Sequence, residues 1–584
     1  MAYLNFKSHY NKEPEIKING FDDHAFQGYK SISRFLAEKS KTKKLIIFEC
    51  YPGVRYDEIK SNLIDPLNPE LVIFSDDLAL SGEEITNKIK RNLTDDRVFG
   101  VMGRYYNLEE FYFPEKVKKA QDLITKTKGL TIIYGFGASL ISKTGIIVYC
   151  DLARWEIQLR YRSHEIGNWK INNFNEDSLK KYKRGYFIEW RLADKIKKSL
   201  FDNIDYLLDT NIKNNPKLIT GEAFRKGMKQ VVKGPFRLVP YFDPGVWGGQ
   251  WMKEVCNLDK NSENYAWSFD GVPEENSLYL TYGQVRVEMP ALNIVLYQPI
   301  ELLGNKVHAR FGTEFPIRFD FLDTMKGGNL SLQVHPLTEY IQSNFGMNYT
   351  QDESYYYLDA EEDAVVYLGI KENINSEDMF RDLEAAQKGE IIFDDAKYIN
   401  KFPARKHDHF LIPAGTIHCS GKNGMVLEIS TSAYIFTFKL WDWNRLGLDG
   451  LPRPVHIEHG KHNVLLDRDT EWVKENLINQ IEVVDSGDGF IEERTGLHER
   501  QFIETRRHWF TKKVLHNTNN TVQVLNLVEG ECVLIESPSN AFEPFEVHYA
   551  ETFIIPACVG EYTIRPYKES ENKKCGTIKA YIRS

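Results

Sequence analysis

Hydrophobic and polar residues follow two different patterns along the chain. From about residue 44 to 205, short apolar runs rich in β-branched residues (KLIIFE, ELVIFS, RVFGVM, LTIIYG and GIIVYCD) are separated by charged segments with helical periodicity, such as EEITNKIKRN and PEKVKKAQDLITKTKG. Strands that alternate with helices in this way predict a parallel sheet flanked by helices. We therefore expect an N-terminal α/β domain over residues 1–205.

From about residue 235 the pattern changes to many short strand-like runs punctuated by glycine and proline, including FPIRFDFL, LSLQVHP, HFLIPAG and MVLEIS. This pattern is typical of an antiparallel sandwich or barrel. It returns over residues 500–584, where FIIPACVGEY echoes the earlier FLIPAGTIHC and indicates a second barrel without the histidines. The expected fold class is multidomain α/β plus all-β, with β domains at 235–465 and 500–584, a linker at 206–234 and a connector at 466–499.

Length and composition support several folded domains. The chain has 584 residues, more than the roughly 250–300 at which single cores stop growing. With 42% hydrophobic and 27% charged residues it resembles an ordinary globular protein. A net charge of -9 without long Lys or Arg runs argues against a nucleic-acid partner. The sequence shows neither a long apolar stretch nor a leader, so we expect a cytoplasmic protein without membrane association, and leave a homo-oligomer open.

Seven cysteines are scattered singly along the chain, without paired spacing. We interpret them as reduced and mostly buried. Cys419 stands beside His418, but a small core residue is the preferred interpretation over a nucleophile.

The N-terminal region holds two weak indications of nucleotide binding. The order of its strands resembles P-loop kinases of the uridine kinase type, with GIIVYCDLARWEIQLRYR similar to their late strand and basic helix. A P-loop needs GxxxxGK[ST] so that backbone amides and a lysine reach the phosphates. KLIIFE is followed instead by CYPGVRYDE, and YGFGAS (134–139) has only GxG. Turn glycines in a structural domain are therefore the favoured interpretation.

A set of possible metal ligands lies in the first β domain. Gln333 and His335 in SLQVHP are two residues apart, which puts both on one face of a strand. Glu353 opens a later strand, and His418 follows a Pro-Ala-Gly turn that would present it at a barrel mouth. Isolated strand histidines are more often hydrogen-bonded core residues, but two imidazoles, a carboxylate and an amide oxygen form an N/O site suited to Zn²⁺.

Two further points concern this site. His407 and His409 form a rival pair, but they lie among charged residues and we interpret them as a solvated beginning of a strand. Residue types alone do not identify the ion, so Fe²⁺ or Mn²⁺ in an oxygen-using cupin is an alternative to one Zn²⁺ per chain.

The region from Phe236 to Gly460 resembles the class I mannose-6-phosphate isomerases, a family of zinc enzymes in the cupin superfamily. The matching pieces, in order, are VWGG, FPIRFDFLD, LSLQVHP, ESYYYLDAEEDA, IPAGTIHC, TFKLWDWNRLGLDG and RPVHIEHG. The resemblance implies that Gln333, His335, Glu353 and His418 bind zinc. It also implies interconversion of mannose 6-phosphate and fructose 6-phosphate through a cis-enediol.

The chain departs from this family where cations are usual. Asp320 stands at a lysine position, with Arg318 two residues earlier on the same strand face, and Gln351 stands where the family has a lysine two residues before the ligand glutamate. Lys439 replaces an arginine, which keeps the charge but loses the two-pronged donor that suits phosphate. We expect Lys439 to stabilise the oxyanion or relay the proton, and Arg445 and Arg318 to bind the substrate.

Two functional hypotheses follow. The first is a zinc-dependent aldose-ketose isomerase that acts on a hexose phosphate or, because cations are missing, on a free hexose. The second is a non-catalytic sugar-sensing or assembly protein that uses the cupin to bind a ligand. Turnover of a hexose distinguishes the two.

Overall fold

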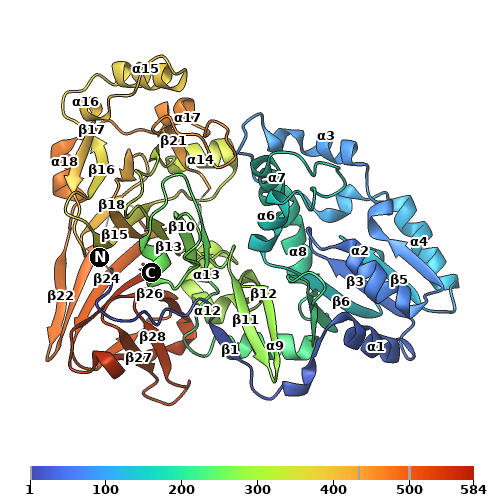
Figure 1. Cartoon of the computed structure of the whole chain (residues 1–584). Helices are drawn as coiled ribbons and strands as arrows, with labels where there is room; N and C mark the ends of the chain where they lie inside the picture. The colour runs from blue at the N-terminus through green and yellow to red at the C-terminus, as the bar shows by residue number, and fades with distance from the viewer. Residues whose placement is uncertain (1–2, 432–434, 497–500, 584) are drawn as a thin grey trace. The chain divides into compact units, whose positions relative to one another are not determined.

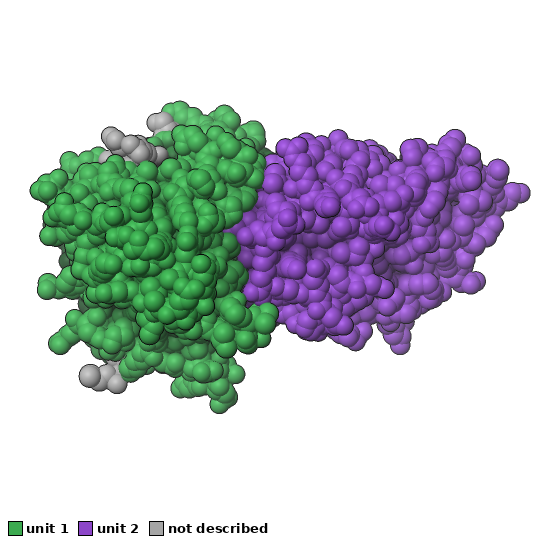
Figure 2. All heavy atoms as spheres, turned by 90° about the horizontal axis from the view of Figure 1, so that it is seen from above, with its two compact units in different colours: residues 1–14, 232–273, 299–584 green, residues 15–231, 274–298 purple. Residues whose placement is uncertain are grey.

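The computed structural model describes residues 3–431, 435–496 and 501–583. The chain divides into two compact units (Figures 1 and 2). Unit 1 consists of Met1–Pro14, Val232–Pro273 and Pro299–Ser584, and unit 2 of Glu15–Val231 and Glu274–Gln298. No helix within the described ranges is long and apolar enough to cross a membrane.

Unit 2 is built on a seven-stranded sheet in the order β2-β8-β7-β6-β3-β5-β4 (Figure 1). Five strands are parallel, namely β3 (Leu45–Cys50), β4 (Leu71–Phe74), β5 (Thr131–Gly135), β6 (Ile146–Asp151) and β7 (Tyr206–Asp209). Helices of this unit include α1 (Tyr29–Ser40), α3 (Gly82–Leu93), α4 (Pro114–Lys126), α6 (Arg154–Arg162), α7 (Ser178–Arg184) and α8 (Trp190–Leu200). The predicted parallel α/β architecture is confirmed.

One predicted strand of this domain was wrong. Residues 97–102, the RVFGVM run, form an irregular turn instead. Asn92 of α3 explains the difference, because its backbone carbonyl accepts from the amide of Val101 at 2.8 Å and its side chain donates to the carbonyl of Val101 at 2.9 Å. Both backbone hydrogen-bonding groups of Val101 are thus satisfied outside a sheet.

The expected linker at 206–234 is folded. It contains β7, then β8 (Lys217–Thr220) and helix α9 (Gly221–Val231). Strand β8 pairs antiparallel with β7, and β2 (Ala25–Gln27) pairs antiparallel with β8 at the sheet edge. The Asn- and Pro-rich stretch that suggested a linker is the loop between β7 and β8.

A segment expected in the first β domain belongs to unit 2. Residues 274–298 form a hairpin of β11 (Ser277–Tyr282) and β12 (Val285–Pro290) followed by α11 (Leu292–Tyr297). Strand β11 pairs in parallel with β1 (Glu15–Lys17) in a three-stranded sheet. Asn293 of α11 donates to Asp151 at 2.9 Å and accepts from Lys197 at 3.0 Å, and all three side chains are buried. This polar contact ties the segment to the carboxyl end of β6.

The first sandwich of unit 1 consists of two antiparallel sheets. One has the order β18-β15-β20-β13-β10-β9, with β9 (Tyr241–Asp243), β10 (Trp267–Gly271), β13 (Arg318–Asp323), β15 (Glu353–Ala360), β18 (His409–Ile412) and β20 (Gly424–Ser430). The other has the order β17-β16-β19-β14-β21, with β14 (Leu332–Val334), β16 (Val365–Ile370), β17 (Ile399–Pro403), β19 (His418–Ser420) and β21 (Phe438–Trp441). These two sheets form the antiparallel β domain that the sequence predicts.

The second sandwich also has two sheets. The first has the order β22-β23-β24-β31-β26-β29, with β22 (Glu482–Gly487), β23 (Phe490–Gly496), β24 (Ile503–Phe510), β26 (Gln523–Glu529), β29 (Thr552–Ile555) and β31 (Cys575–Ile582). The second has the order β25-β30-β27-β28, with β25 (Val514–Asn517), β27 (Cys532–Glu536), β28 (Phe545–His548) and β30 (Glu561–Pro566). The predicted connector 466–499 therefore already contains two strands of this sandwich.

Candidate metal centre

Three buried side chains from the two sheets of the first sandwich converge on one point. His335 Nε2 lies 2.9 Å from Glu353 Oε2, and His418 Nε2 lies 2.7 Å from Glu353 Oε1. All three residues are at most 1% exposed. Glu353 opens β15 of one sheet, whereas His418 opens β19 and His335 follows β14 of the other. The sandwich interior thus brings together ligands that are far apart in the sequence.

Backbone carbonyls orient both imidazoles. His335 Nδ1 lies 3.2 Å from the carbonyl oxygen of Phe436, and His418 Nδ1 lies 3.0 Å from that of Thr416. A carbonyl only accepts, so each Nδ1 carries hydrogen and each ring turns its Nε2 toward the Glu353 carboxylate. A proton or a metal cation between each Nε2 and the carboxylate oxygens would satisfy both partners.

The unsatisfied atoms at this point fit a metal ion. His335 Nε2 and Glu353 Oε1 are buried and have no hydrogen-bond partner among the described residues. Imidazoles anchored through Nδ1 to carbonyls are the usual arrangement of metal-binding histidines. Two such imidazoles and one carboxylate match the ligand chemistry of Zn²⁺, although the same set also accepts Fe²⁺ or Mn²⁺.

The carboxyl group of Glu353 is held in its ionised form. Burial by itself raises its pKa, but the neighbouring His335 and His418 overcome this effect and hold the pKa of Glu353 well below the usual range. Gln351 also donates its amide Nε2 to Glu353 Oε2 at 2.9 Å. An anionic ligand is therefore available at neutral pH.

Gln333 and Lys439 extend the site along one row of the second sheet. Gln333 pairs directly with His418 on one side and with Lys439 on the other, and directly opposed residues share a sheet face. The amide Nε2 of Gln333 lies 3.2 Å from His418 Nε2, and turning the amide over would offer its oxygen instead. The row therefore places Lys439 on the same face as two of the four predicted ligands.

Arg318 lies on the facing sheet in a cluster of acids. Through Ser430 of β20, it shares a cross-strand row with Glu353. Its guanidinium is 3.0 Å from Asp320 and 3.6 Å from Glu428, and all three side chains are buried. Arg318 is therefore near the predicted ligands, but its charge is compensated by two carboxyl groups.

Glu428 is a site residue that the sequence analysis missed. It lies directly opposite Asp320 on the neighbouring strand. Burial raises the pKa of Asp320 to about 7, against the opposing effect of Arg318, and burial together with Asp320 raises the pKa of Glu428 well above its usual value. The glutamate within the otherwise apolar run MVLEIS was the available signal, because its phase places it on the inner face.

Arg445 has a different environment. Its guanidinium lies 2.5 Å from Asp442 Oδ1, and Arg453 pairs with the same carboxylate. Burial lowers the pKa of Arg445 despite Asp442. These contacts hold Arg445 against Asp442. A role of Arg445 in substrate binding stays a prediction.

Three further residues that the sequence analysis singled out are Cys419, His407 and His409. Cys419 is fully buried, as predicted, and burial raises the pKa of its thiol well above the usual value. The solvated interpretation was wrong for His409, which is fully buried, and burial lowers its pKa to about 3. His407 is partly exposed and lies 3.2 Å from Glu529 of the second sandwich. Packing of the second sandwich over β18 explains the burial, since Gly496 lies close to the His409 ring.

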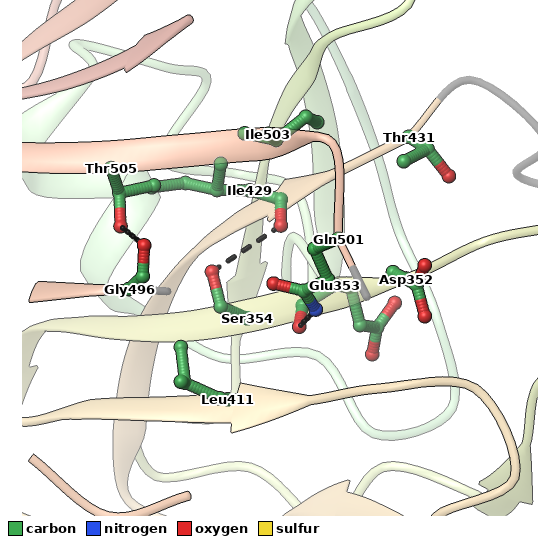
Figure 3. Close-up of a pocket in the computed structure, with 10 residues that line it drawn as sticks. All are labelled: Asp352, Glu353, Ser354, Leu411, Ile429, Thr431, Gly496, Gln501, Ile503 and Thr505. Atoms are coloured by element: carbon green, nitrogen blue, oxygen red, sulfur yellow. Dashed lines mark hydrogen bonds between the residues drawn. The ribbon is translucent and has the colours of Figure 1, made fainter. Parts of the chain in front are cut away.

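A small cavity borders strand β15, with Glu353 among the residues that line it (Figure 3). Its lining includes Ser354, Ile429 and Thr505, and Ser354 donates to the Ile429 carbonyl at 3.4 Å. Alternation along β15 turns Ser354 away from the face that carries the Glu353 side chain. At about 10 Å³ the cavity has room for no more than about one water molecule, so it is not a sugar site.

The glycine turn of unit 2 is occupied by the chain itself. Glu49 of β3 accepts hydrogen bonds from the amides of Gly137 and Ser139, both at 2.7 Å. Glu49 is 1% exposed, and burial raises its pKa to about 7 in spite of these bonds. Two of the backbone amides that could bind a phosphate at YGFGAS are therefore already used.

Comparisons with known proteins give two kinds of match. Residues 28–233 match a family described as a domain of unknown function. That description assigns no activity, so the resemblance to P-loop kinases stays a prediction.

The chain is also distantly related to mannose-6-phosphate isomerases. The enzyme of Streptococcus mutans is 28% identical over 215 residues, 36% of this chain and 62% of that protein, so the chain spans less than two thirds of this relative. A probable mannose-6-phosphate isomerase of Bacillus subtilis is 25% identical over 257 residues, 43% of this chain and 73% of that protein. The crystal structure of the Bacillus subtilis mannose 6-phosphate isomerase covers 60% of this chain and 100% of that one, with 19% identity and a TM-score of 0.48.

Proposed function

We propose that the protein is a zinc-dependent aldose-ketose isomerase, with mannose 6-phosphate and fructose 6-phosphate, or a related hexose pair, as its substrates. The observation that carries the proposal is the convergence of His335, Glu353 and His418 inside a domain related to mannose-6-phosphate isomerases. When bound, a divalent ion supplies a Lewis acid that stabilises negative charge on two adjacent sugar oxygens. Gln333, His335, Glu353 and His418 would hold that ion.

Lys439 is the proposed catalytic residue. Isomerisation moves a proton between C1 and C2 of the open sugar, and charge develops on the neighbouring oxygens as the cis-enediol forms. An ammonium group stabilises such charge best where water is excluded. Lys439 is half-buried and lies in the same strand row as Gln333 and His418. It would stabilise the developing oxyanion or relay the proton.

Arg318 and Arg445 are the proposed substrate-binding residues, and the acidic groups paired with them differ. Arg318 faces the interior from the sheet that carries Glu353, and its partners Asp320 and Glu428 have raised pKa values that favour their neutral forms. Arg445 is bound to Asp442, so it would have to exchange this partner for a phosphate.

The experiment is a coupled assay of the purified chain with mannose 6-phosphate and with free mannose, with and without a chelator. We expect turnover of one of them, loss of turnover with the chelator, and recovery on adding Zn²⁺. Elemental analysis of the protein as isolated distinguishes zinc from iron and manganese. Bound zinc without turnover of any hexose would contradict the proposal.

The second candidate is a non-catalytic sugar-sensing or assembly protein. The missing lysines at positions 320 and 351 favour it, because a dianionic phosphate would lack their compensating charge. Calorimetry that detects sugar binding without entry of solvent deuterium at C2 would support this candidate. Deuterium in the recovered sugar would exclude it.

A further inference from the structure

We propose that Cys532, Glu546 and His548 form a second metal-binding site, on the outer face of the second sandwich, to which the nearby exposed His9 would add a fourth donor by reorienting its side chain. The donors are one thiol, one carboxylate and two imidazoles, a set that suits a divalent cation of the zinc type. The site is separate from the candidate centre of the first sandwich, and its test does not depend on isomerase activity.

Strand pairing builds this site. In the antiparallel pair of β27 and β28, Cys532 lies directly opposite His548, and Glu546 is two residues before His548 on the same face. The intervening Val533 and Val547 point the other way, into the hydrophobic core of the sandwich. One ligand atom from each of Cys532, Glu546 and His548 lies within 4.8 Å of the others. Within the described part of the chain, one other such group exists, that of the first sandwich.

Cys532 is not an ordinary surface cysteine. Its side chain is 1% exposed because the turn at Lys568–Ser570 closes over it, where the Ser570 hydroxyl accepts from the amides of Glu531 at 2.9 Å and Cys532 at 3.0 Å. The thiol is thus held in place beside His548 at the inner end of the cluster.

The imidazole of His9, which comes from the N-terminal segment, lies beside the same cluster. Its ring centroid lies 5.7 Å from that of His548, with an angle of 32° between the rings. The two histidines of the first candidate centre are arranged similarly, at 5.0 Å and 39°. The segment that carries His9 is held against the second sandwich by Asn11, whose backbone amide donates to the Glu551 carboxylate at 2.7 Å.

An ion pair currently compensates the carboxylate. Lys568 Nζ lies 2.6 and 2.7 Å from the two oxygens of Glu546, and His548 Nε2 lies 2.9 Å from Glu546 Oε1. A divalent cation would take the place of the ammonium group, and the partly exposed Lys568 would turn to solvent. Through His9, the bound ion would fasten residues 3–14 to the second sandwich.

Cobalt distinguishes this site from the first one because a Co²⁺-thiolate bond gives a near-ultraviolet charge-transfer band, and the first centre has no sulfur ligand. The metal-free full chain would be titrated with Co²⁺ as wild type and as the double variant His335→Ala/His418→Ala. We expect the thiolate band in both proteins, and one bound ion in the double variant.

The variant Cys532→Ser should lose the band, and His548→Gln should weaken Co²⁺ binding about 10-fold or more. The matched control Cys558→Ser changes an exposed cysteine of the same sandwich and should keep the band. Circular dichroism checks that each variant is folded. Cobalt binding without a thiolate band, or a band that persists in Cys532→Ser, would overturn the proposal.

Discussion

The two sandwiches of unit 1 share an architecture but differ in what fills them. The first encloses a histidine pair, three carboxyl groups and an arginine, all buried. The second encloses an apolar cluster from both of its sheets, made of Phe510, Val514, Leu525, Leu527, Val533, Ile535, Val547, Phe553, Ile555, Tyr562, Ile564 and Cys575. It also buries two histidines, His508 and His516, with ring centroids 4.6 Å apart, but within the described residues they belong to no group of three converging ligands. The same fold thus serves either to position polar groups or to build a stable core, and its residues decide which.

The repeated turn shows this difference at one position. In the first sandwich, FLIPAGTIH leads from β18 to His418 at the start of β19, and His418 is fully buried. In the second, FIIPACVGE leads from β29 to Glu561 at the start of β30, and Glu561 is exposed. Burying charged groups is costly unless they are paired or bind a metal. Of the two sandwiches, the first buries a titratable side chain, His418, at the end of this turn. This is consistent with a functional interior.

The largest effect is expected from exchanging this position in each sandwich. His418→Ala should abolish tight metal binding and reduce kcat/KM by about 100-fold or more, because it removes one of three converging ligands. The matched variant Glu561→Ala should change neither quantity. Elemental analysis and the coupled assay measure both. Equal metal content in the two variants would break the comparison.

A core substitution in the second sandwich should lower stability without changing metal binding at the first centre. Leu527 is fully buried, so Leu527→Ala should lower the free energy of unfolding by about 2–5 kcal/mol through lost burial and a cavity. Metal content at the first centre should stay the same. Urea unfolding measures the effect, with Leu515→Ala, at a 60% exposed position, as control. A larger loss in the control would contradict the assigned core.

Lys439 tests whether the polar row is catalytic. Lys439→Ala should lower kcat by about 100-fold while metal content and KM stay close to wild type, as expected when a group acts in proton transfer or on developing charge. Lys439→Arg should restore part of the rate if charge alone is needed. Lys512→Ala, a surface lysine of the second sandwich, is the control. An unchanged kcat would restrict Lys439 to a structural role.

The smallest effects concern pH, and they have opposite signs in the two sandwiches. Burial raises the pKa of Asp320 from 3.8 to about 7, so the folded state binds the extra proton and stability should fall as pH rises from about 4 to 7. Burial lowers the pKa of Lys579 from 10.5 to about 8, so the unfolded state binds the extra proton and stability should rise from about pH 8 to 10.5.

Urea midpoints across pH measure these two slopes. Asp320→Asn should flatten the acidic slope and leave the basic one, and Lys579→Met should do the reverse. A variant that alters both slopes equally would show that these groups do not titrate independently.

Much of this architecture was predictable because its signals are local. Apolar runs with a period of two marked most strands of both sandwiches, and alternation along SLQVHP placed Gln333 and His335 in one phase. The order of matching pieces identified His335, Glu353 and His418, which the structure brings together. The turn at 97–102 was mispredicted because Asn92, on a neighbouring helix, supplies its hydrogen bonds.

The sequence by itself determined most element types, the two β sandwiches and the strand phase of the candidate metal ligands, since each depends on neighbours within a few residues. Only the tertiary structure decided which side chains meet. In the folded chain, residues 274–298 belong to unit 2 and Arg445 pairs with Asp442. His409 is buried, and His9 lies beside His548. These outcomes depend on contacts between distant segments, and residue spacing along a chain carries no information about such contacts until the sheets have formed and packed.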